Sequence, residues 1–212
     1  MLRRIFLLII LMCLPGLCQP GAASGVDEIL RAYDMKPNIR NGEKVYAKCV
    51  SCHQEKGWGK EDGSVPVIAG QYAKVLIRQL ADIRALSKED NPEMYLQADP
   101  DQMGGAQAIA DVSAYLASMA GDANTSKGRG DQLDLGKKLY EARCRQCHGD
   151  QAQGDVLEFV PKLKGQHYAY LLRRIQWIGS GNKKNSKPIM VLRTKSLSAT
   201  EMEAVADYIS RM

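Results

Sequence analysis

The chain is built twice from one plan, and this duplication limits its fold more than any other feature. Cys49 and Cys52, with His53 directly after them, return 95 residues later in the same spacing. Three further blocks recur in order: residues 65–71 and 76–83 return at 160–166 and 171–178 with the same offset, and residues 109–116 return at 202–209 with an offset of 93. Agreement over four separated blocks indicates a tandem duplication.

A polar stretch with three glycines, residues 121–130, separates the two copies. Such a composition does not bury a face, so it marks a linker. We therefore predict a first domain over residues 26–120 and a second over residues 131–212, with a signal peptide over residues 1–25.

The predicted signal peptide has two early arginines, an apolar run over residues 5–14 and small residues before position 25. Cleavage is expected after Ala23 or Gly25, and the mature chain is expected in the periplasm. An uncleaved anchor is disfavoured because the apolar run is shorter than the ~20 residues that span a bilayer. Export removes two of the six cysteines and leaves those of the repeated motif.

Apolar residues within each copy follow helical spacing. Leu76, Leu80 and Ile83 fall at i, i+4 and i+7, and the second copy repeats the pattern. Shorter helices are expected at residues 42–48 and 134–143, and no stretch alternates as a strand does. The fold class is therefore all-α, with two small helical domains whose long loops need a stabilising element. With only 6% aromatic residues to build two cores, a buried cofactor would supply it.

The repeated motif defines that cofactor. Two cysteines three positions apart reach both vinyl groups of a haem, and the histidine after them lies below the ring and offers its imidazole to the iron. A zinc site would need further cysteine or histidine ligands, but only His167 remains. We predict two covalent haem c groups. The predicted attachment and proximal residues are Cys49, Cys52, His53, Cys144, Cys147 and His148.

Elimination narrows the sixth iron ligand to methionine or an open position. No cysteine is left over, and His167 is expected to be a surface or capping residue. Met94 and Met190 lie 41 and 42 residues after the proximal histidines, each two residues after a proline, and are the predicted ligands. Met103, 50 residues after its histidine, remains the alternative in the first copy. Histidine with methionine closes the iron to substrates, which suits electron transfer.

These motifs together resemble a class I cytochrome c domain. They comprise Gly-x-x-apolar-Tyr before the cysteines, Cys-x-x-Cys-His, Pro-x-apolar-x-Gly-Gln and Pro-x-Met before a last helix that ends in Tyr. Two such domains behind a signal peptide resemble the cytochrome c4 family over nearly all of residues 26–212. The first copy departs by three extra residues between Met94 and the last helix. The resemblance also implies that the carbonyls of Pro66 and Pro161 accept the proximal imidazole N–H and fix the ring.

The resemblance implies a periplasmic dihaem carrier, soluble or loosely held at the membrane. Its donor would be a dehydrogenase or a quinol-oxidising bc-type complex of a respiratory chain, and its acceptor a terminal oxidase or reductase. An alternative is an electron-accepting subunit of a larger dehydrogenase, such as a flavoenzyme that oxidises sulfur compounds. A large exposed apolar patch would favour the subunit. An enzyme in its own right is disfavoured because catalysis needs a free iron position.

Charge differs between the copies. Residues 26–120 carry 11 basic and 14 acidic residues, whereas residues 121–212 carry 16 and 10. The contrast is strongest beside the predicted methionine ligands, with acidic residues near Met94 and basic residues near Met190. These are either solvated loops or surfaces that steer two different redox partners. A nucleic-acid partner is not needed to explain the positive side.

Overall fold

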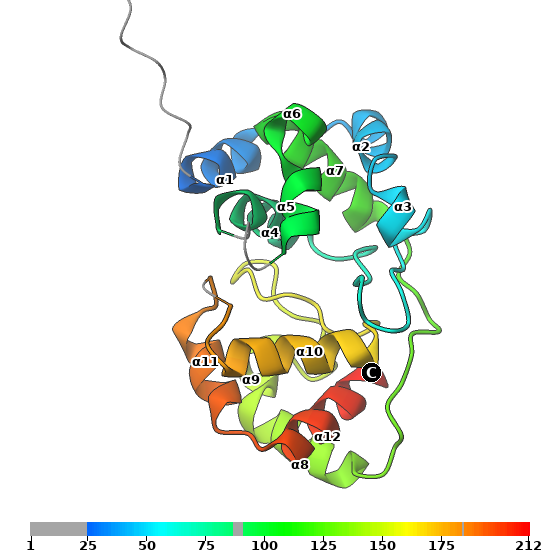
Figure 1. Ribbon diagram of the computed structural model, residues 1–212, viewed down its shortest axis with the longest axis vertical. Helices are drawn as coiled ribbons and strands as arrows, with labels where there is room; N and C mark the ends of the chain where they lie inside the picture. The colour runs from blue at the N-terminus through cyan, green and yellow to red at the C-terminus, as the bar shows by residue number, and fades with distance from the viewer. Residues whose placement is uncertain (1–24, 87–90, 184) are drawn as a thin grey trace, which may run out of the picture.

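The computed structural model describes residues 25–86, 91–183 and 185–212, so the predicted signal peptide lies outside the described residues. Figure 1 shows two helical lobes joined by an extended connection. The N-terminal lobe contains α1 (Gly25–Asp34), α2 (Ile39–Tyr46), α3 (Val50–His53), α4 (Ala73–Leu86), α5 (Pro92–Ala98), α6 (Pro100–Met103) and α7 (Ala106–Ser118). The C-terminal lobe contains α8 (Leu133–Arg143), α9 (Arg145–His148), α10 (Tyr168–Gly179), α11 (Pro188–Lys195) and α12 (Ala199–Ser210).

The all-α prediction is confirmed. Within the described residues, the only β-structure is an isolated bridge between Asp155 and Val160. The helices begin where local chemistry allows. Asn38 caps α2 by accepting from the Asn41 backbone, and Ser198 with Glu201 forms a reciprocal capping box at α12. Among these helices, none is long and apolar enough to cross a membrane.

Each lobe is organised around a crossing of two helices, α2 with α7 and α8 with α12. A glycine lies at each crossing. A Cβ on Gly42 would lie 2.2 Å from the Asp111 carbonyl oxygen, and one on Gly136 would lie 2.2 Å from that of Ala204. Only a residue without a side chain lets the backbones approach so closely. The glycine of the repeated Gly-x-x-apolar-Tyr motif therefore has a packing role.

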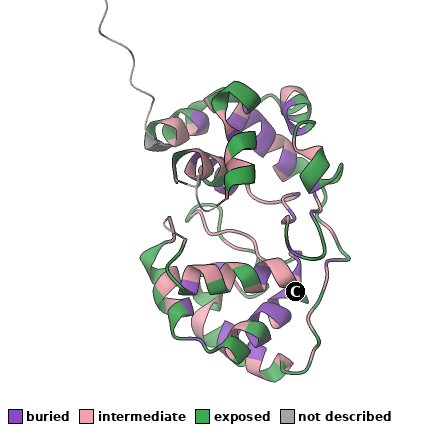
Figure 2. Cartoon of the chain, in the orientation of Figure 1, coloured by how far each residue is buried: buried purple, intermediate pink, exposed green. Residues whose placement is uncertain are grey.

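The tyrosine one turn after each of these glycines is buried, Tyr46 at 2% and Tyr140 at 1% exposure. Their hydroxyl groups donate to the carbonyls of Gln54 and Gly149, the residues directly after the two proximal histidines. The tyrosines thus join the helix crossing to the cysteine motif. Figure 2 shows buried positions inside both lobes, and the buried residues form two separate apolar cores.

Candidate haem sites

The cysteine motif forms one helical turn in both lobes. Cys49 and Cys144 occupy the N-cap positions of α3 and α9, and their carbonyls accept the backbone N–H of His53 and His148 at 2.9 Å. Residues three and four positions apart share one helix face, so the turn presents both thiols and the imidazole together. Among the described residues, the four cysteines of the two motifs, Cys49, Cys52, Cys144 and Cys147, form no disulfide, so their sulfur atoms can form thioether bonds.

The two proximal histidines are buried, at 5% and 4% exposure. Nδ1 of His53 lies 3.2 Å from the carbonyl oxygen of Pro66, and Nδ1 of His148 lies 3.2 Å from that of Pro161. Burial lowers the pKa of both imidazoles, so the neutral ring is favoured. With Nδ1–H donated to the carbonyl, Nε2 is left as the metal-binding nitrogen, and it makes no hydrogen bond to any described residue.

Sequence reasoning missed the glycines that make room for these carbonyls. Gly59 and Gly154 each lie six residues after a proximal histidine and adopt φ of +68° and +73°. A Cβ would lie 2.5 Å from the Pro66 oxygen in one lobe and 2.7 Å from the Pro161 oxygen in the other. Their shared offset from the histidine was the available signal. The reason for the glycine is visible only in three dimensions.

The methionines differ in their surroundings. Met94 on α5 and Met190 on α11 are half-buried, so part of each side chain remains outside the protein core. Met103 is 6% exposed and belongs to the apolar core of the N-terminal lobe. This environment is that of a packing residue, because the core already surrounds it.

The helix that carries Met94 is held by a buried arginine that sequence reasoning did not single out. The Arg84 guanidinium donates to the carbonyls of Ala98, the last residue of α5, and Gly104, the residue directly after α6. It also pairs with Glu28 on α1. Gly179 takes the equivalent place in the C-terminal lobe, where a Cβ would lie 3.3 Å from the Thr194 backbone of α11. The longer segment after Met94 is thus bound by an arginine at Ala98 and Gly104, whereas the shorter segment after Met190 packs on a glycine at Thr194.

His167 was expected at the surface or as a cap, and the surface expectation is wrong. Its side chain is 2% exposed. It occupies the N-cap position of α10 but makes no capping hydrogen bond there. Instead Nδ1 accepts the Ser126 backbone N–H at 3.1 Å, and Nε2 lies 2.9 Å from the Trp58 carbonyl of the N-terminal lobe. This histidine joins the two lobes through the connection between them.

Gln54, directly after His53, has φ 64° and ψ 164°, a region that glycine alone adopts easily. The equivalent residue of the C-terminal lobe is Gly149, with φ 82° and ψ 172°. We expect Gln54→Gly to raise the free energy of unfolding of the N-terminal lobe by about 1 kcal/mol, because relieved strain exceeds the added entropy of glycine. Denaturant titration of the holoprotein measures this. Gln54→Ala keeps the Cβ and should give no gain; an equal gain from alanine would contradict the explanation.

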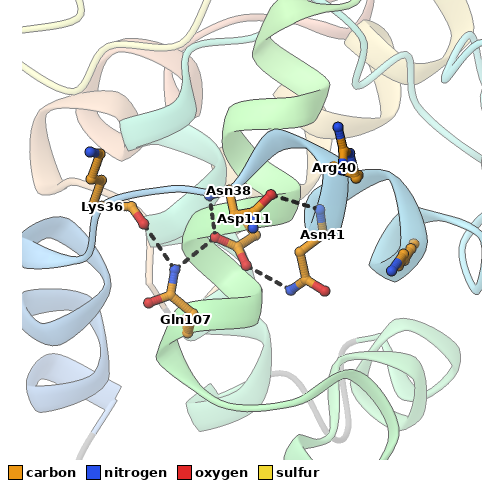
Figure 3. Close-up of a pocket in the computed structure, with 7 residues that line it drawn as sticks. Lys36, Asn38, Arg40, Asn41, Gln107 and Asp111 are labelled. Carbon is orange, nitrogen blue, oxygen red and sulfur yellow. Dashed lines mark hydrogen bonds between the residues drawn. The ribbon is translucent and has the colours of Figure 1, made fainter.

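A surface pocket near the start of α2 is shown in Figure 3. The Asp111 carboxylate at its base is 1% exposed and accepts hydrogen bonds from the Asn38 backbone and from the Asn41 and Gln107 side chains, each at 2.7 Å. These groups satisfy one another. The pocket is lined by no cysteine, histidine or methionine, so we assign its polar residues to holding α2 against α7.

Each lobe thus combines a Cys-x-x-Cys-His turn, a buried neutral imidazole fixed by a proline carbonyl, and a half-buried methionine on a later helix. This donor set fits a covalently attached haem c, for which thioether bonds and an axial histidine are needed. The sequence matches the cytochrome c family over residues 39–120 and again over residues 133–212. The chain therefore belongs to the cytochrome c family, with two copies of the domain.

Within that family the chain is similar to the dihaem cytochromes c4. It is 30% identical to cytochrome c4 of Stutzerimonas stutzeri over 181 residues, which are 79% of this chain and 86% of that protein. Reduced recombinant cytochrome c4 from Pseudomonas stutzeri superposes with a TM-score of 0.68 at 28% identity, covering 82% of this chain and 98% of that chain. These likenesses identify the chain as a member of the cytochrome c4 family.

A thiosulfate dehydrogenase from Marichromatium purpuratum also contains this architecture. It matches 82% of this chain with 40% of its own length, at a TM-score of 0.69 and 26% identity. The predicted fold of tandem class I cytochrome c domains and the prediction of two haem c groups are confirmed. The protein is a dihaem c-type cytochrome that transfers single electrons.

Proposed function

We propose that each lobe holds one haem through its own set of residues. Cys49 and Cys52 attach the first haem, with His53 and Met94 as axial ligands. Cys144, Cys147, His148 and Met190 serve the second in the same way. The bound groups supply reversible one-electron chemistry. The carbonyls of Pro66 and Pro161 orient the imidazoles and raise their basicity as ligands.

The supporting observation is the pair of His–Pro contacts, both 3.2 Å long, one in each copy of the duplicated domain. A buried histidine held by one nitrogen offers the other in a fixed direction, as an axial ligand must. The burial of Met103 in the core favours Met94 as the sulfur ligand of the first haem. With both axial positions filled by the chain, we propose no catalysis at the iron.

The test uses the exported, mature holoprotein. Its mass should exceed that of the cleaved chain by two haems, and its ferric spectrum should show the methionine–iron absorption for both. Met94→Leu and Met190→Leu should each remove about half of that absorption, whereas the matched change Met103→Leu should leave it intact. Loss of the absorption in Met103→Leu instead of Met94→Leu would overturn the assignment. A single attached haem would overturn the two-site proposal itself.

We further propose that the protein acts in the periplasm as a carrier between a donor and an acceptor of different charge. The support is the net charge of opposite sign on the two copies. One of the basic residues near Met190, Lys183, also has a role inside the protein. Burial raises the pKa of the Asp82 carboxyl in the N-terminal lobe, and the nearby charge of Lys183 opposes that rise. Lys187 and Lys195 are exposed and can attract an acidic partner, although the Lys187 ammonium also donates to the Glu158 carbonyl at 3.0 Å.

A subunit of a larger dehydrogenase is the second candidate, favoured by the likeness to a thiosulfate dehydrogenase. Exposed apolar side chains at Leu157, Ile189 and Leu192 in the C-terminal lobe fit a lasting contact. The two roles differ in how long the partner stays bound. A carrier forms small, weak encounters, whereas a subunit co-elutes with its enzyme in fixed stoichiometry during gel filtration.

A further inference from the structure

The glutamine that ends each copy of the Pro-x-apolar-x-Gly-Gln motif makes hydrogen bonds to the opposite lobe. Gln166 Oε1 accepts the backbone N–H of Val67 at 3.0 Å, and Gln166 Nε2 donates to the Val67 carbonyl at 2.9 Å. Gln71 does the same to Lys162, with distances of 3.0 and 2.9 Å. Each side chain thus makes a two-bond bridge to the backbone of the opposite lobe, and the two bridges are related by the duplication.

The bridged residues directly follow Pro66 and Pro161. The Pro66 carbonyl and the Val67 N–H belong to a single peptide group, as do the Pro161 carbonyl and the Lys162 N–H. One continuous chain of hydrogen bonds therefore runs from His53 Nδ1 through the Pro66 peptide to Gln166 of the other lobe. The equivalent chain of hydrogen bonds in the other direction runs from His148 Nδ1 through the Pro161 peptide to Gln71 of the N-terminal lobe.

Hydrogen bonds in such a chain strengthen one another. When a peptide N–H donates, its carbonyl oxygen gains negative charge and becomes a better acceptor. A stronger bond at Nδ1 makes the imidazole a more basic ligand at its other nitrogen. A more basic axial ligand favours ferric over ferrous iron and so lowers the reduction potential.

On this ground we propose that Gln71 and Gln166 are positioning residues that act in trans, each tuning the proximal histidine, and thereby the haem potential, of the opposite lobe. The proposal rests on the proposed haem sites. It adds that the reduction potential of each haem depends on a glutamine side chain of the opposite lobe.

The same oxygens make one further contact each. Gln71 Oε1 also accepts the backbone N–H of Tyr72, and Gln166 Oε1 that of His167, at 3.0 and 3.1 Å. These local bonds orient the glutamine side chains at the starts of α4 and α10. The glutamines are therefore held from their own lobe and directed at the other.

The experiment is a redox titration of the holoprotein followed by NMR, with the haem methyl resonances of each lobe assigned through contacts to its own residues. Gln166→Leu should shift the electron affinity of the N-terminal haem upward about threefold, ~28 mV at 59 mV per tenfold for one electron, and leave the other haem unchanged. Gln71→Leu should do the reverse. In the reduced protein, the Nδ1–H proton of the affected histidine should move upfield as its hydrogen bond weakens.

Tyr72→Phe is the matched control. It removes another hydrogen bond between the lobes, Tyr72 hydroxyl to the Gln153 carbonyl at 2.9 Å, without touching either proline peptide, and should shift neither potential. Gln166→Glu keeps an acceptor for Val67 and should not raise the N-terminal potential. Shifts in the substituted lobe, equal shifts in both haems, or no shift would overturn the proposal. Two reversible haem couples in these variants would still leave the proposed haem sites intact, so the two ideas fail separately.

Discussion

Replacing Arg84 with leucine is expected to lower the free energy of unfolding of the N-terminal lobe by about 3–5 kcal/mol, because it leaves a partly buried carboxylate and two carbonyls without their donor. The Arg84 side chain is 6% exposed and its partner Glu28 17%. Since the freed carbonyls lie at the C-terminal ends of α5 and α6, the helix that carries Met94 should also lose its fixed position. Denaturant titration of the holoprotein measures the first effect, and the methionine–iron absorption measures the second.

Arg78 provides the control for this substitution. It lies on the same helix and pairs with Asp82 at 3.8 Å, but its side chain is 39% exposed. Asp82 is 20% exposed, but its pair with Arg78 is long and Lys183 also lies near its carboxylate. Arg78→Leu should therefore cost at most about 1 kcal/mol and leave both methionine–iron absorptions intact. If Arg84→Leu were equally mild, the proposed role of the arginine in holding the Met94 segment would be wrong.

Gly154→Ala is expected to destabilise the C-terminal lobe by about 2–4 kcal/mol. The positive φ costs about 1–2 kcal/mol for any residue with a Cβ. The new carbon would also lie 2.5 Å from the Val160 oxygen and 2.7 Å from the Pro161 oxygen, and backbone movement must relieve both contacts. That movement displaces the acceptor of the His148 ring. The midpoint of denaturation should fall, and the Nδ1–H resonance of His148 in the reduced protein should shift while that of His53 stays.

Gly181→Ala separates strain from collision. Gly181 has φ of +77°, close to that of Gly154, but nothing lies within 4 Å of the position its Cβ would take. It should therefore cost only about 1 kcal/mol and leave the histidine resonance unmoved. Equal effects from the two substitutions would show that the contact with the proline carbonyl carries no weight.

Local pattern was sufficient for much of this protein because the relevant chemistry is encoded within a few residues. A helix face repeats every three or four residues, so the spacing of Leu76, Leu80 and Ile83 predicted α4. The cysteine motif fits within one turn, and that turn forms in both lobes as its spacing requires. The helices before the cysteines were predicted at residues 42–48 and 134–143, whereas the structure has them at Ile39–Tyr46 and Leu133–Arg143. Helix ends are less predictable than helix faces because capping depends on local backbone geometry.

Contacts between distant segments were not readable in this way. His167 looked like a surface or capping residue because its role depends on Trp58, 109 positions away. The role of Arg84 could not be predicted, because it depends on the carbonyls of Ala98 and Gly104, which reach the arginine only in the folded lobe. The function of Gln71 and Gln166 could not be predicted from one copy of the motif, because each side chain makes its hydrogen bonds to the backbone of the opposite lobe.

The amino-acid order by itself determined the duplication, the helical class, the covalent haem motif and the choice of candidate axial ligands, since all of these follow from spacing along the chain. The tertiary structure decided which glycines make room for the proline carbonyls, how an arginine and a glycine hold equivalent helices, and how Gln71 and Gln166 reach the opposite lobe. The reason is physical: these features depend on the close approach of backbones far apart in sequence, and such distances are fixed only when both lobes have packed.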